Sequence, residues 1–377
     1  MSEFELIVPT LFGLEAFVVR ELKRLGYENT TTEDGRVTFS GDSLAICRAN
    51  LWLRSGERVL VKVAEFNALS FEELFENTKA IDWSRFIPVN GAFPVKGFSL
   101  KSKLASVRDC QAIIKKAVVD SLGASYGITQ LPEDEECYQI QFSIMKDRVT
   151  LMIDTSGESL HKRGYRKISN AAPLRETIAA AMVMMSYWKF EYPFADPFCG
   201  SGTIPIEAAM FKRNIAPGLL RNFSAESFNF IPEKLWAQAR DEAISLKRDT
   251  PLEIFASDID PEAVEIATEN ARLAGVDDVI KPKIANALDF SCSSPYGTII
   301  CNPPYGERLS DVKECEKLYA KMGKAFSALA DWSYYVLASN ENFEKLFGKK
   351  ADKKRKIYNG MIKCNVYQFF GKRPPKV

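Results

Sequence analysis

The chain has 377 residues, of which 46% are hydrophobic and 26% charged, and its formal net charge is +1. A chain of this length is too long for one compact core, so its composition favours an ordinary globular protein of two or three domains. The near-zero net charge excludes a strongly basic protein whose whole surface attracts nucleic acid, and any such contact must come from local patches.

The eight cysteines form no C-x-x-C pair, and they fall inside apolar helical or strand patterns. They are interpreted as reduced core residues rather than as disulfides or zinc ligands, and no metal site is predicted. The first residues lack a basic segment followed by an apolar stretch, and no apolar run approaches membrane-spanning length. We therefore expect a cytoplasmic protein that is neither secreted nor inserted in a membrane.

Residues 1–65 show the order strand, helix, two strands, helix, strand. Periodic apolar spacing marks these elements at residues 4–8, 14–25, 37–39, 43–53 and 58–63, with a hairpin turn at Asp34-Gly35. The order predicts a small ferredoxin-like α+β unit. From the sequence alone, a plain structural role is favoured for it.

Residues 66–164 show a second α/β pattern, with helical spacing at 71–76 and 106–122 and strand patterns at 137–144 and 149–153. Basic residues gather in this part of the chain: Lys96, Lys101, Lys103, Arg108, Lys115 and Lys116. Such a cluster can neutralise phosphates, and it can equally be a solvated helix face. The acidic run at 133–136 is predicted to form an exposed loop that points away from any nucleic acid.

Small and basic residues between 155 and 170 predict a linker, which precedes a helix over residues 173–187. The linker holds His161, the only histidine of the chain, beside Lys162, Arg163 and Arg166. No second residue supports a histidine-centred triad, so this segment is interpreted as facing phosphate rather than as supplying a general base.

From residue 165 to 377, strand and helix patterns alternate, which predicts a parallel, doubly wound sheet. The expected strands are 194–196, 254–257, 279–284, 298–301, 332–338 and 357–370, and the expected helices are one from 204 onward, 261–274 and 318–330. The turn Asn359-Gly360 fits an antiparallel final hairpin. A phenylalanine-rich insertion at 216–231 is expected to cover the sheet, with a flap over the site as the alternative. The basic residues at 349–350 and 353–356 either contact phosphate or keep a loop soluble.

A glycine turn follows the first of these strands, in the sequence Asp196-Pro197-Phe198-Cys199-Gly200-Ser201-Gly202-Thr203. Glycines on both sides of Ser201 let the backbone approach a ligand at the carboxyl end of the strand. Pro205 stands where a dinucleotide motif has its third glycine, and no Gly-Lys-Ser/Thr follows, so neither nucleotide-phosphate motif is supported. Asp196 remains as an acceptor for a cationic amino group. The alternative is a tight connection without a ligand.

The second strand ends in acids, in the sequence Ser257-Asp258-Ile259-Asp260-Pro261. An acid at this place can bind a ribose diol. An acid directly before a proline also suits the N-cap of a helix. We assign the diol to Asp258 and the cap to Asp260.

The third motif is Asn302-Pro303-Pro304-Tyr305, which follows a β-branched strand at 298–300. Two prolines fix the backbone and remove two donors, so nearby carbonyls stay free to accept hydrogen bonds. In isolation, a strand-ending turn is an equally good interpretation. After a glycine turn and an acidic strand end, a catalytic loop is favoured.

Four segments resemble, in order and spacing, the motifs of class I S-adenosylmethionine-dependent methyltransferases of the amino-group type. They are Asp196 to Thr203, the Asp258/Asp260 pair, Asn286 to Phe290 and Asn302 to Tyr305. The segments Leu160 to Arg166 and Ala172 to Thr177 are similar to the THUMP-domain RNA guanine-N2 methyltransferases. The resemblance covers essentially the whole chain. It identifies a ferredoxin-like domain at 1–65, an RNA-binding THUMP domain at 66–164 and a Rossmann-like methyltransferase domain at 165–377.

The resemblance implies S-adenosylmethionine as the methyl donor, without a metal. The methionine end would be held by Asp196 and by the turn residues Phe198, Cys199, Gly200, Ser201, Gly202 and Thr203. Asp258 would bind the ribose with Ile259 beside it, and Asn286 with Ala287 would contact the adenine. Many relatives carry an aspartate where this chain has Asn286, which leaves Asp289 as the alternative adenine contact.

The resemblance also implies roles for the Asn302 loop. The Asn302 side-chain oxygen and the Pro303 carbonyl would each accept a hydrogen of the exocyclic guanine amine, so that the nitrogen lone pair faces the methyl group. Pro304 belongs to the same rigid loop. Tyr305 would stack on the base, which must leave its RNA surroundings to reach the pocket.

RNA is the implied partner, most closely bacterial large-subunit ribosomal RNA, with transfer RNA as the alternative. A non-catalytic RNA-binding protein with a methyltransferase-like fold is the alternative of a different class. The sequence does not fix the oligomeric state, and a monomer is favoured. Deleting the first 160 residues is expected to leave a folded domain that still binds the donor.

Overall fold

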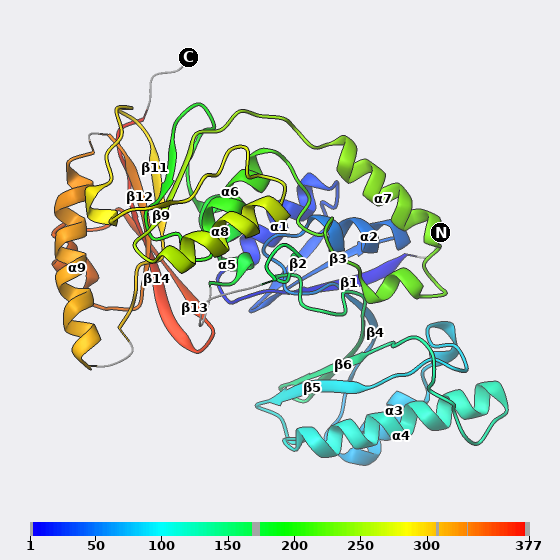
Figure 1. Cartoon of the computed structure of the whole chain (residues 1–377). Coiled ribbons are helices and arrows are strands. Elements are labelled where there is room, and N and C mark those ends of the chain that lie inside the picture. Colours follow the sequence, from blue (N-terminus) through cyan, green and yellow to red (C-terminus); the bar gives the residue numbers. More distant parts are fainter. Residues whose placement is uncertain (1–2, 168–173, 307–308, 330, 374–377) are drawn as a thin grey trace.

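Two seven-stranded sheets organise this computed structural model, which describes residues 3–167, 174–306, 309–329 and 331–373. The first sheet draws its strands from residues 4–154 and the second from residues 194–369. Figure 1 shows three parts: the second sheet with its helices on the left, the N-terminal elements in the middle, and a lobe at the lower right.

The N-terminal elements have the predicted β-α-β-β-α-β order. They are β1 (Phe4–Pro9), α1 (Glu15–Arg24), β2 (Thr30–Glu33), β3 (Arg36–Gly41), α2 (Ser43–Trp52) and β4 (Leu60–Asn67). β1 lies between β3 and β4 and is antiparallel to both, which confirms the ferredoxin-like prediction. Asp42 begins α2 by accepting a hydrogen bond from the backbone N–H of Ala45, at 3.0 Å.

The lobe at the lower right extends the first sheet instead of forming one of its own. Its elements are α3 (Phe71–Lys79), a 3-10 turn (Trp83–Arg85), β5 (Val95–Leu100), α4 (Val107–Tyr126), β6 (Ile140–Met145) and β7 (Arg148–Asp154). β4 pairs with β1 near its start and with β7 from Leu60 to Asn67, so the order is β2-β3-β1-β4-β7-β6-β5. In Figure 1, β4 leads from the middle of the molecule into this lobe. The sequence patterns do not predict β5, which pairs in parallel with β6.

The second sheet is doubly wound, as predicted. Its strands are β8 (Phe194–Asp196), β9 (Ile254–Asp258), β10 (Lys283–Ile284), β11 (Thr298–Cys301), β12 (Ser333–Ala338), β13 (Lys353–Asn359) and β14 (Ile362–Phe369). They have the order β10-β9-β8-β11-β12-β14-β13, in which β14 is antiparallel to both of its neighbours. The strand predicted at 279–284 is reduced to the two residues of β10.

Helices cover both faces of this sheet. They are α5 (Glu176–Met185), α6 (Thr203–Lys212), α8 (Pro261–Leu273), α9 (Leu309–Ser327) and α10 (Phe343–Phe347). Successive residues of β11 alternate between two cores: Ile300 packs with α5, α6 and α8, whereas Ile299 and Cys301 pack with α9 and α10. The helix expected from residue 318 begins nine residues earlier, at Leu309; residues 173 and 330, the outer limits of two predicted helices, lie outside the described residues.

The phenylalanine-rich insertion at 216–231 packs mainly on the first sheet. Phe223 and Phe228 are buried in the core of the first sheet, and the Phe228 ring stacks on Tyr138 with centroids 4.3 Å apart. The next helix, α7 (Glu233–Ser245), lies against α2, as Figure 1 shows. The predicted cover of the second sheet therefore holds for Leu219, which packs against both cores, but not for the buried phenylalanines, and no residue of the insertion lines the cavity as a flap would.

The predicted linker at 155–170, described up to residue 167, mixes buried, half-buried and exposed residues, and Thr155, Ser156, Leu160, Arg163 and Tyr165 are buried. Arg163 is 2% exposed, and its Nε donates a hydrogen bond to Oε1 of Glu207 on α6, at 3.3 Å. Nδ1 of His161 lies 3.5 Å from the Glu57 carboxylate. The prediction that this segment faces phosphate is therefore wrong for Arg163, which instead joins the linker to the second sheet's helices.

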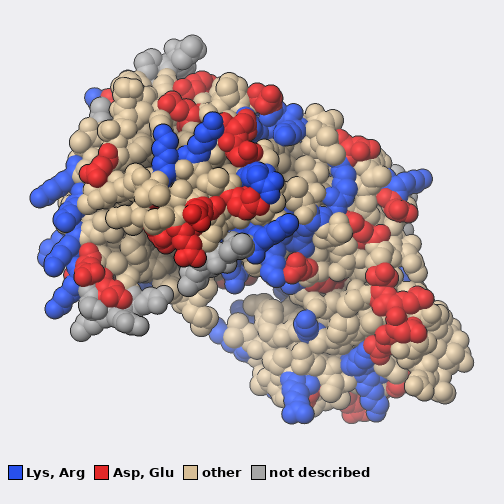
Figure 2. All heavy atoms as spheres, viewed as in Figure 1, with Lys and Arg blue, Asp and Glu red and all other residues tan. Residues whose placement is uncertain are grey.

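Basic and acidic side chains are interspersed on the face that Figure 2 shows, in keeping with the near-zero net charge. In the lower lobe, Nζ of Lys115 lies 2.5 Å from Oε2 of Glu133 and 3.4 Å from the centroid of the Phe93 ring. The acidic run at 133–136 thus begins beside the basic cluster instead of pointing away from it. The lysines at 353–356, expected in a loop, lie in β13.

Candidate active site

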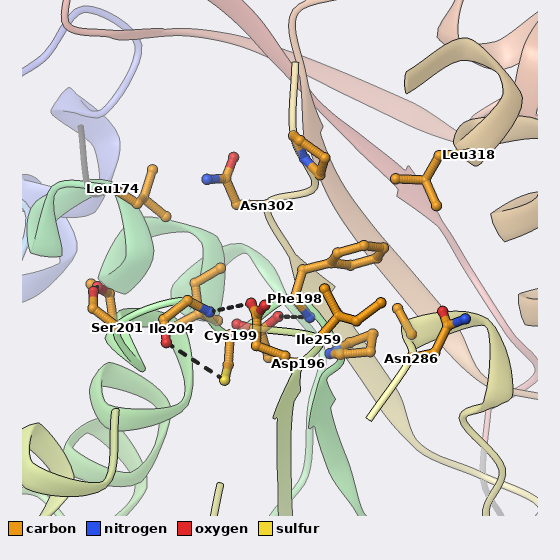
Figure 3. A pocket seen from close by; sticks show the side chains of 16 residues that line it. Leu174, Asp196, Phe198, Cys199, Ser201, Ile204, Ile259, Asn286, Asn302 and Leu318 are labelled. Carbon is orange, nitrogen blue, oxygen red and sulfur yellow. Dashed lines mark hydrogen bonds between the residues drawn. The ribbon is translucent and has the colours of Figure 1, made fainter. Parts of the chain in front are cut away.

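A cavity of about 470 Å³ opens at the carboxyl ends of β8, β9 and β11, the edge at which doubly wound sheets bind ligands. Figure 3 shows its side chains converging from the turn after β8, the end of β9 and the loop after β11. Most predicted site residues line it: Asp196, Phe198, Cys199, Gly200, Ser201, Thr203, Asp258, Ile259, Asn286, Ala287, Asn302 and Pro304. The predicted residues Gly202, Pro303 and Tyr305 are not part of the lining.

The cavity also has lining residues that the motifs do not assign to the site, namely Leu174, Pro197, Ile204 and Leu318. Leu174 belongs to the segment 172–177 that carries the family resemblance, of which 172 and 173 lie outside the described residues. Leu318 comes from α9 and has no local signal, because a leucine on a helix at apolar spacing indicates core. In Figure 3, Leu174 and Leu318 lie on opposite sides of the cavity.

The two glycines of the turn serve different purposes. Both have positive φ angles, +50° at Gly200 and +81° at Gly202, which glycine adopts at little cost. A Cβ atom on Gly200 would meet nothing within 4 Å, whereas one on Gly202 would lie 3.1 Å from Cβ of Ala267 on α8. The predicted backbone approach to a ligand therefore fits Gly200, and Gly202 instead lets α6 and α8 pack closely.

Asp196 is a buried carboxyl group with one unsatisfied oxygen. It is 1% exposed, and its Oδ1 accepts a hydrogen bond from the backbone N–H of Phe198, at 3.1 Å. Its Oδ2 has no hydrogen-bond partner among the described residues. Burial raises the pKa of Asp196 well above its ordinary value, and the nearby Asp258 carboxylate raises it further. The cavity thus contains an acceptor that lacks a donor.

Of the two roles predicted for Asp258 and Asp260, the structure confirms the helix cap. Oδ1 of Asp260 accepts from the backbone N–H of Glu262 at 3.0 Å, which confirms Asp260 as the N-cap of α8. Asp258 lines the cavity, with Oδ2 accepting from the N–H of Gly200 at 2.9 Å and Oδ1 from the N–H of Asp260 at 3.1 Å. Asp258 therefore ties the glycine turn to β9, and each of its oxygens keeps a lone pair for a further donor.

Asn286 lies at the rim of the cavity, before a short 3-10 turn (Ala287–Asp289). Its Oδ1 accepts from the backbone N–H of Leu288 at 3.1 Å, which orients the side-chain amide. Asp289 is exposed and is not part of the lining. Between the two residues predicted as alternatives for one contact, the geometry favours Asn286.

The Asn302 loop is held by two tyrosines. The Tyr305 hydroxyl donates to Oδ1 of Asn302 at 2.5 Å, and the Tyr319 hydroxyl donates to the carbonyl of Pro304 at 2.7 Å. Tyr305 is half-buried against the core that includes Cys364, and this burial raises the pKa of its hydroxyl. In this conformation the ring does not line the cavity and its hydroxyl supports Asn302, so stacking on a base stays a prediction.

Arg166 is a residue whose position the sequence interpretation misplaced. Its Nη2 donates to Oγ1 of Thr203 at 2.6 Å and to the carbonyl of Leu174 at 3.0 Å, and it lies 3.3 Å from the Glu176 carboxylate. It therefore connects two lining residues of the cavity from behind. The sequence marks Arg166 as part of the basic segment near His161, but this segment was predicted to contact phosphate rather than to support the cavity.

Among the described residues, no group of three or more His, Cys, Asp or Glu side chains is placed to hold a metal ion. In the same part of the chain, no helix is both long and apolar enough to cross a membrane.

Known families match the chain in three successive regions. Residues 5–60 match the RlmL ferredoxin-like domain, residues 68–154 match the THUMP domain, and residues 163–368 match the RMKL-like methyltransferase domain. The last region contains the whole cavity described above, including the glycine turn and the Asn302 loop.

Individual relatives agree with these matches. The Bacillus subtilis protein named "Putative RNA methyltransferase YpsC" is 50% identical, over 100% of this chain and 98% of the relative. The ribosomal RNA large subunit methyltransferase K/L of Psychromonas ingrahamii is 34% identical over 97% of this chain, which spans 50% of that longer protein. The crystal structure of SMU.472 complexed with SAH is 44% identical over 100% of both chains, with a TM-score of 0.94. The chain therefore belongs to the RMKL-like methyltransferase family, in which it joins the methyltransferase domain to a ferredoxin-like and a THUMP domain.

Proposed function

We propose that the chain transfers a methyl group from S-adenosylmethionine to the exocyclic N2 amine of a guanine in large-subunit ribosomal RNA. SAH, the compound in the SMU.472 structure, is what S-adenosylmethionine becomes when it loses its methyl group, so family and relative together support this donor. The THUMP domain and the ribosomal RNA in the name of the Psychromonas relative support RNA as the acceptor. The guanine N2 position rests on the sequence resemblance.

The observation that carries the proposal is the unpartnered oxygen of Asp196 in a cavity that also contains Asn302. A cationic amino group, such as that of the methionine part of the donor, would give this oxygen its missing partner and favour the charged carboxylate. Asp258 has lone pairs left for ribose hydroxyls, and Asn286, which lines the same cavity, would contact the adenine edge. The residues present therefore fit the donor.

When bound, the donor supplies an activated methyl group, and the chain has to orient the acceptor. The Tyr305 hydroxyl fixes the Asn302 amide so that its oxygen is directed, with one lone pair still free for an N–H of the base. With the Pro303 carbonyl as second acceptor, the two N–H groups of the amine would be held and its lone pair turned toward the methyl group. The proton that the amine loses passes to water.

Replacing Asp196 with asparagine is expected to stabilise the donor-free protein near neutral pH and to weaken donor binding about tenfold to a hundredfold. Because the folded-state pKa of Asp196 lies above the unfolded value, the folded chain holds a proton that the unfolded chain has lost. The stability contributed by the neutral carboxyl therefore falls as the pH rises above the unfolded value, and asparagine removes this loss. Thermal unfolding over a pH series, with and without donor, measures both effects.

Asp260→Asn is the matched control, because Asp260 is exposed, caps α8 and can be replaced by asparagine, which also caps helices well. Neither its unfolding midpoint nor its donor affinity should change appreciably. Unchanged donor affinity in Asp196→Asn would remove Asp196 from the donor site.

The substrate is tested by incubating the protein with labelled donor and separate pools of undermodified ribosomal and transfer RNA, followed by digestion to nucleosides. Label in N2-methylguanosine from ribosomal RNA is the expected result. Label from transfer RNA alone would replace ribosomal RNA as the acceptor, and label only in methyladenosine or in protein would overturn the proposal. Donor binding without label in any pool would favour a non-catalytic RNA-binding protein.

A further inference from the structure

A second concave region lies at the amino ends of the parallel strands β11 and β12, whereas the donor cavity lies at the carboxyl ends. Two cavities of about 610 and 430 Å³ share Tyr187 and Lys353 in their linings. The larger one reaches the first residues of β11 and β12. We call these two joined cavities the Tyr187 groove.

The charged side chains of the Tyr187 groove are almost all cationic. Lys354 is paired with Glu344, and Lys372 with Asp331, the one acid in the two linings. Within the described part of the chain, no carboxylate forms an ion pair with the five remaining cations, which are Arg20, Lys189, Lys353, Arg355 and Arg373. On a chain with a net charge of +1, this groove is a local concentration of uncompensated positive charge.

Two of these cations are held close together although they repel each other. The guanidinium groups of Arg20 and Arg355 lie 4.5 and 5.1 Å from the centroid of the same ring, Phe17. Arg355 is fixed there by donating to the carbonyl of Gly13 at 2.7 Å. Burial and the neighbouring charges of Arg24 and Arg355 lower the pKa of Arg20. An anion between Arg20 and Arg355 would relieve this repulsion.

The groove also carries aromatic surface that faces solvent. Tyr187 is 70% exposed, although its ring packs edge-on against Phe370 with centroids 5.6 Å apart. Tyr192 and Tyr296 form a second such pair in the lining, also at 5.6 Å. Cations that can track a phosphate chain, interleaved with rings on which bases can stack, are the combination that binds single-stranded nucleic acid.

We propose that the Tyr187 groove binds a single-stranded segment of the RNA substrate, with phosphates at Arg20, Lys353 and Lys189 and a base on Tyr187. This inference rests on the proposed function, because it takes the acceptor to be RNA. α5 has 10 residues, so about 15 Å separates the donor-cavity side of this helix from its groove side. The groove therefore contributes RNA affinity and register at a distance from the methyl group, not chemistry.

The lysines on the outer face of α9 provide a matched comparison. Lys313, Lys317, Lys321 and Lys324 are exposed, and no ion pair holds them in the described structure, but no cavity or exposed ring accompanies them. They follow one another at helical spacing, as on an ordinary solvated face. If positive charge alone attracted RNA, they would contribute as much as the groove.

The test compares the full chain, the triple variant Arg20→Gln/Lys189→Gln/Lys353→Gln, and the control Lys317→Gln/Lys321→Gln/Lys324→Gln. Binding of a fluorescently labelled single-stranded RNA is measured over a salt series. The groove variant is expected to bind about tenfold to a hundredfold more weakly, with the slope of log K against log salt reduced by about 2. Tyr187→Ala should weaken binding about tenfold without changing this slope.

Equal losses in the groove and α9 variants, or no loss in either, would overturn the proposal. An acidic peptide that displaced the RNA equally from the wild type and from the groove variant would also overturn the proposal, and it would indicate a protein partner. Methyl transfer to RNA is measured in parallel. A wild-type chain that neither binds nor methylates RNA would refute the proposed function, whereas normal methylation with an unaffected groove variant would refute only the groove.

Discussion

Replacing Asn302 with alanine is expected to lower methyl transfer about a hundredfold or more while leaving donor affinity within about twofold, because the lost hydrogen bond acts mainly in the transition state. Asn302 lines the donor cavity, but its oxygen is directed by Tyr305 rather than by any residue of the glycine turn. Donor affinity by calorimetry and single-turnover transfer rates measure the two effects separately.

Two further variants make this prediction sharper. Tyr305→Phe keeps the ring and removes only the hydroxyl that donates to Asn302, so a smaller loss of about tenfold is expected at unchanged donor affinity. Asp258→Ala should show the reverse pattern, with donor affinity strongly weakened, since a ribose diol would lose its acceptor. If Asn302→Ala abolished donor binding as well, the division of roles between donor site and acceptor loop would be wrong.

Replacing Arg163 with leucine is expected to lower the free energy of unfolding by about 3 to 5 kcal/mol, because it would leave a buried charge without its partner. Glu207 is fully buried, with Oε1 accepting from Arg163 Nε at 3.3 Å and no described partner for Oε2. Arg163 also donates to the carbonyl of Arg54 at 2.6 Å, so the same side chain joins α6 to the ferredoxin-like unit. Urea unfolding, followed by tryptophan fluorescence, measures the loss.

The control is Arg272→Leu, which breaks an ion pair with Glu269 whose side chains are 61% and 48% exposed. Exposed pairs contribute about 0 to 1 kcal/mol, so little change is expected. The double variant Arg163→Leu/Glu207→Leu should recover part of the loss, since both buried charges are removed together. If Arg163→Leu were as stable as the wild type, the Arg163–Glu207 pair would not hold α6 to the ferredoxin-like unit.

This buried contact also changes what truncation should do. Residues 216–243 contribute Phe223, Phe228 and Trp236 to the core of the first sheet, so a chain starting near residue 160 would expose apolar surface and leave Glu207 without Arg54 nearby. The prediction that residues beyond 160 fold alone and bind the donor is therefore replaced by the expectation of an aggregating fragment.

The sequence determined the cavity at the carboxyl edge of the second sheet because its signals there are local. Gly200 has a positive φ in the turn after β8, Asp260 precedes a proline just after β9, and Asn302 precedes two prolines directly after β11. Parallel strands place such segments at one edge whatever the rest of the chain does, so twelve of the predicted residues line one cavity. Composition and periodicity were likewise enough for the doubly wound and ferredoxin-like patterns.

Tertiary structure alone decided which chemically ambiguous residues are buried, because a side chain's partner is often far away in sequence. Arg163 lies in a basic segment, which predicts a phosphate contact. In the structure it pairs instead with Glu207, 44 residues later. The insertion at 216–231 is apolar enough to cover either sheet, and only long-range packing assigns its phenylalanines to the first. The Tyr187 groove joins Arg20, Tyr187 and Lys353, which no local pattern relates, since their proximity arises only when α1, α5 and β13 pack together.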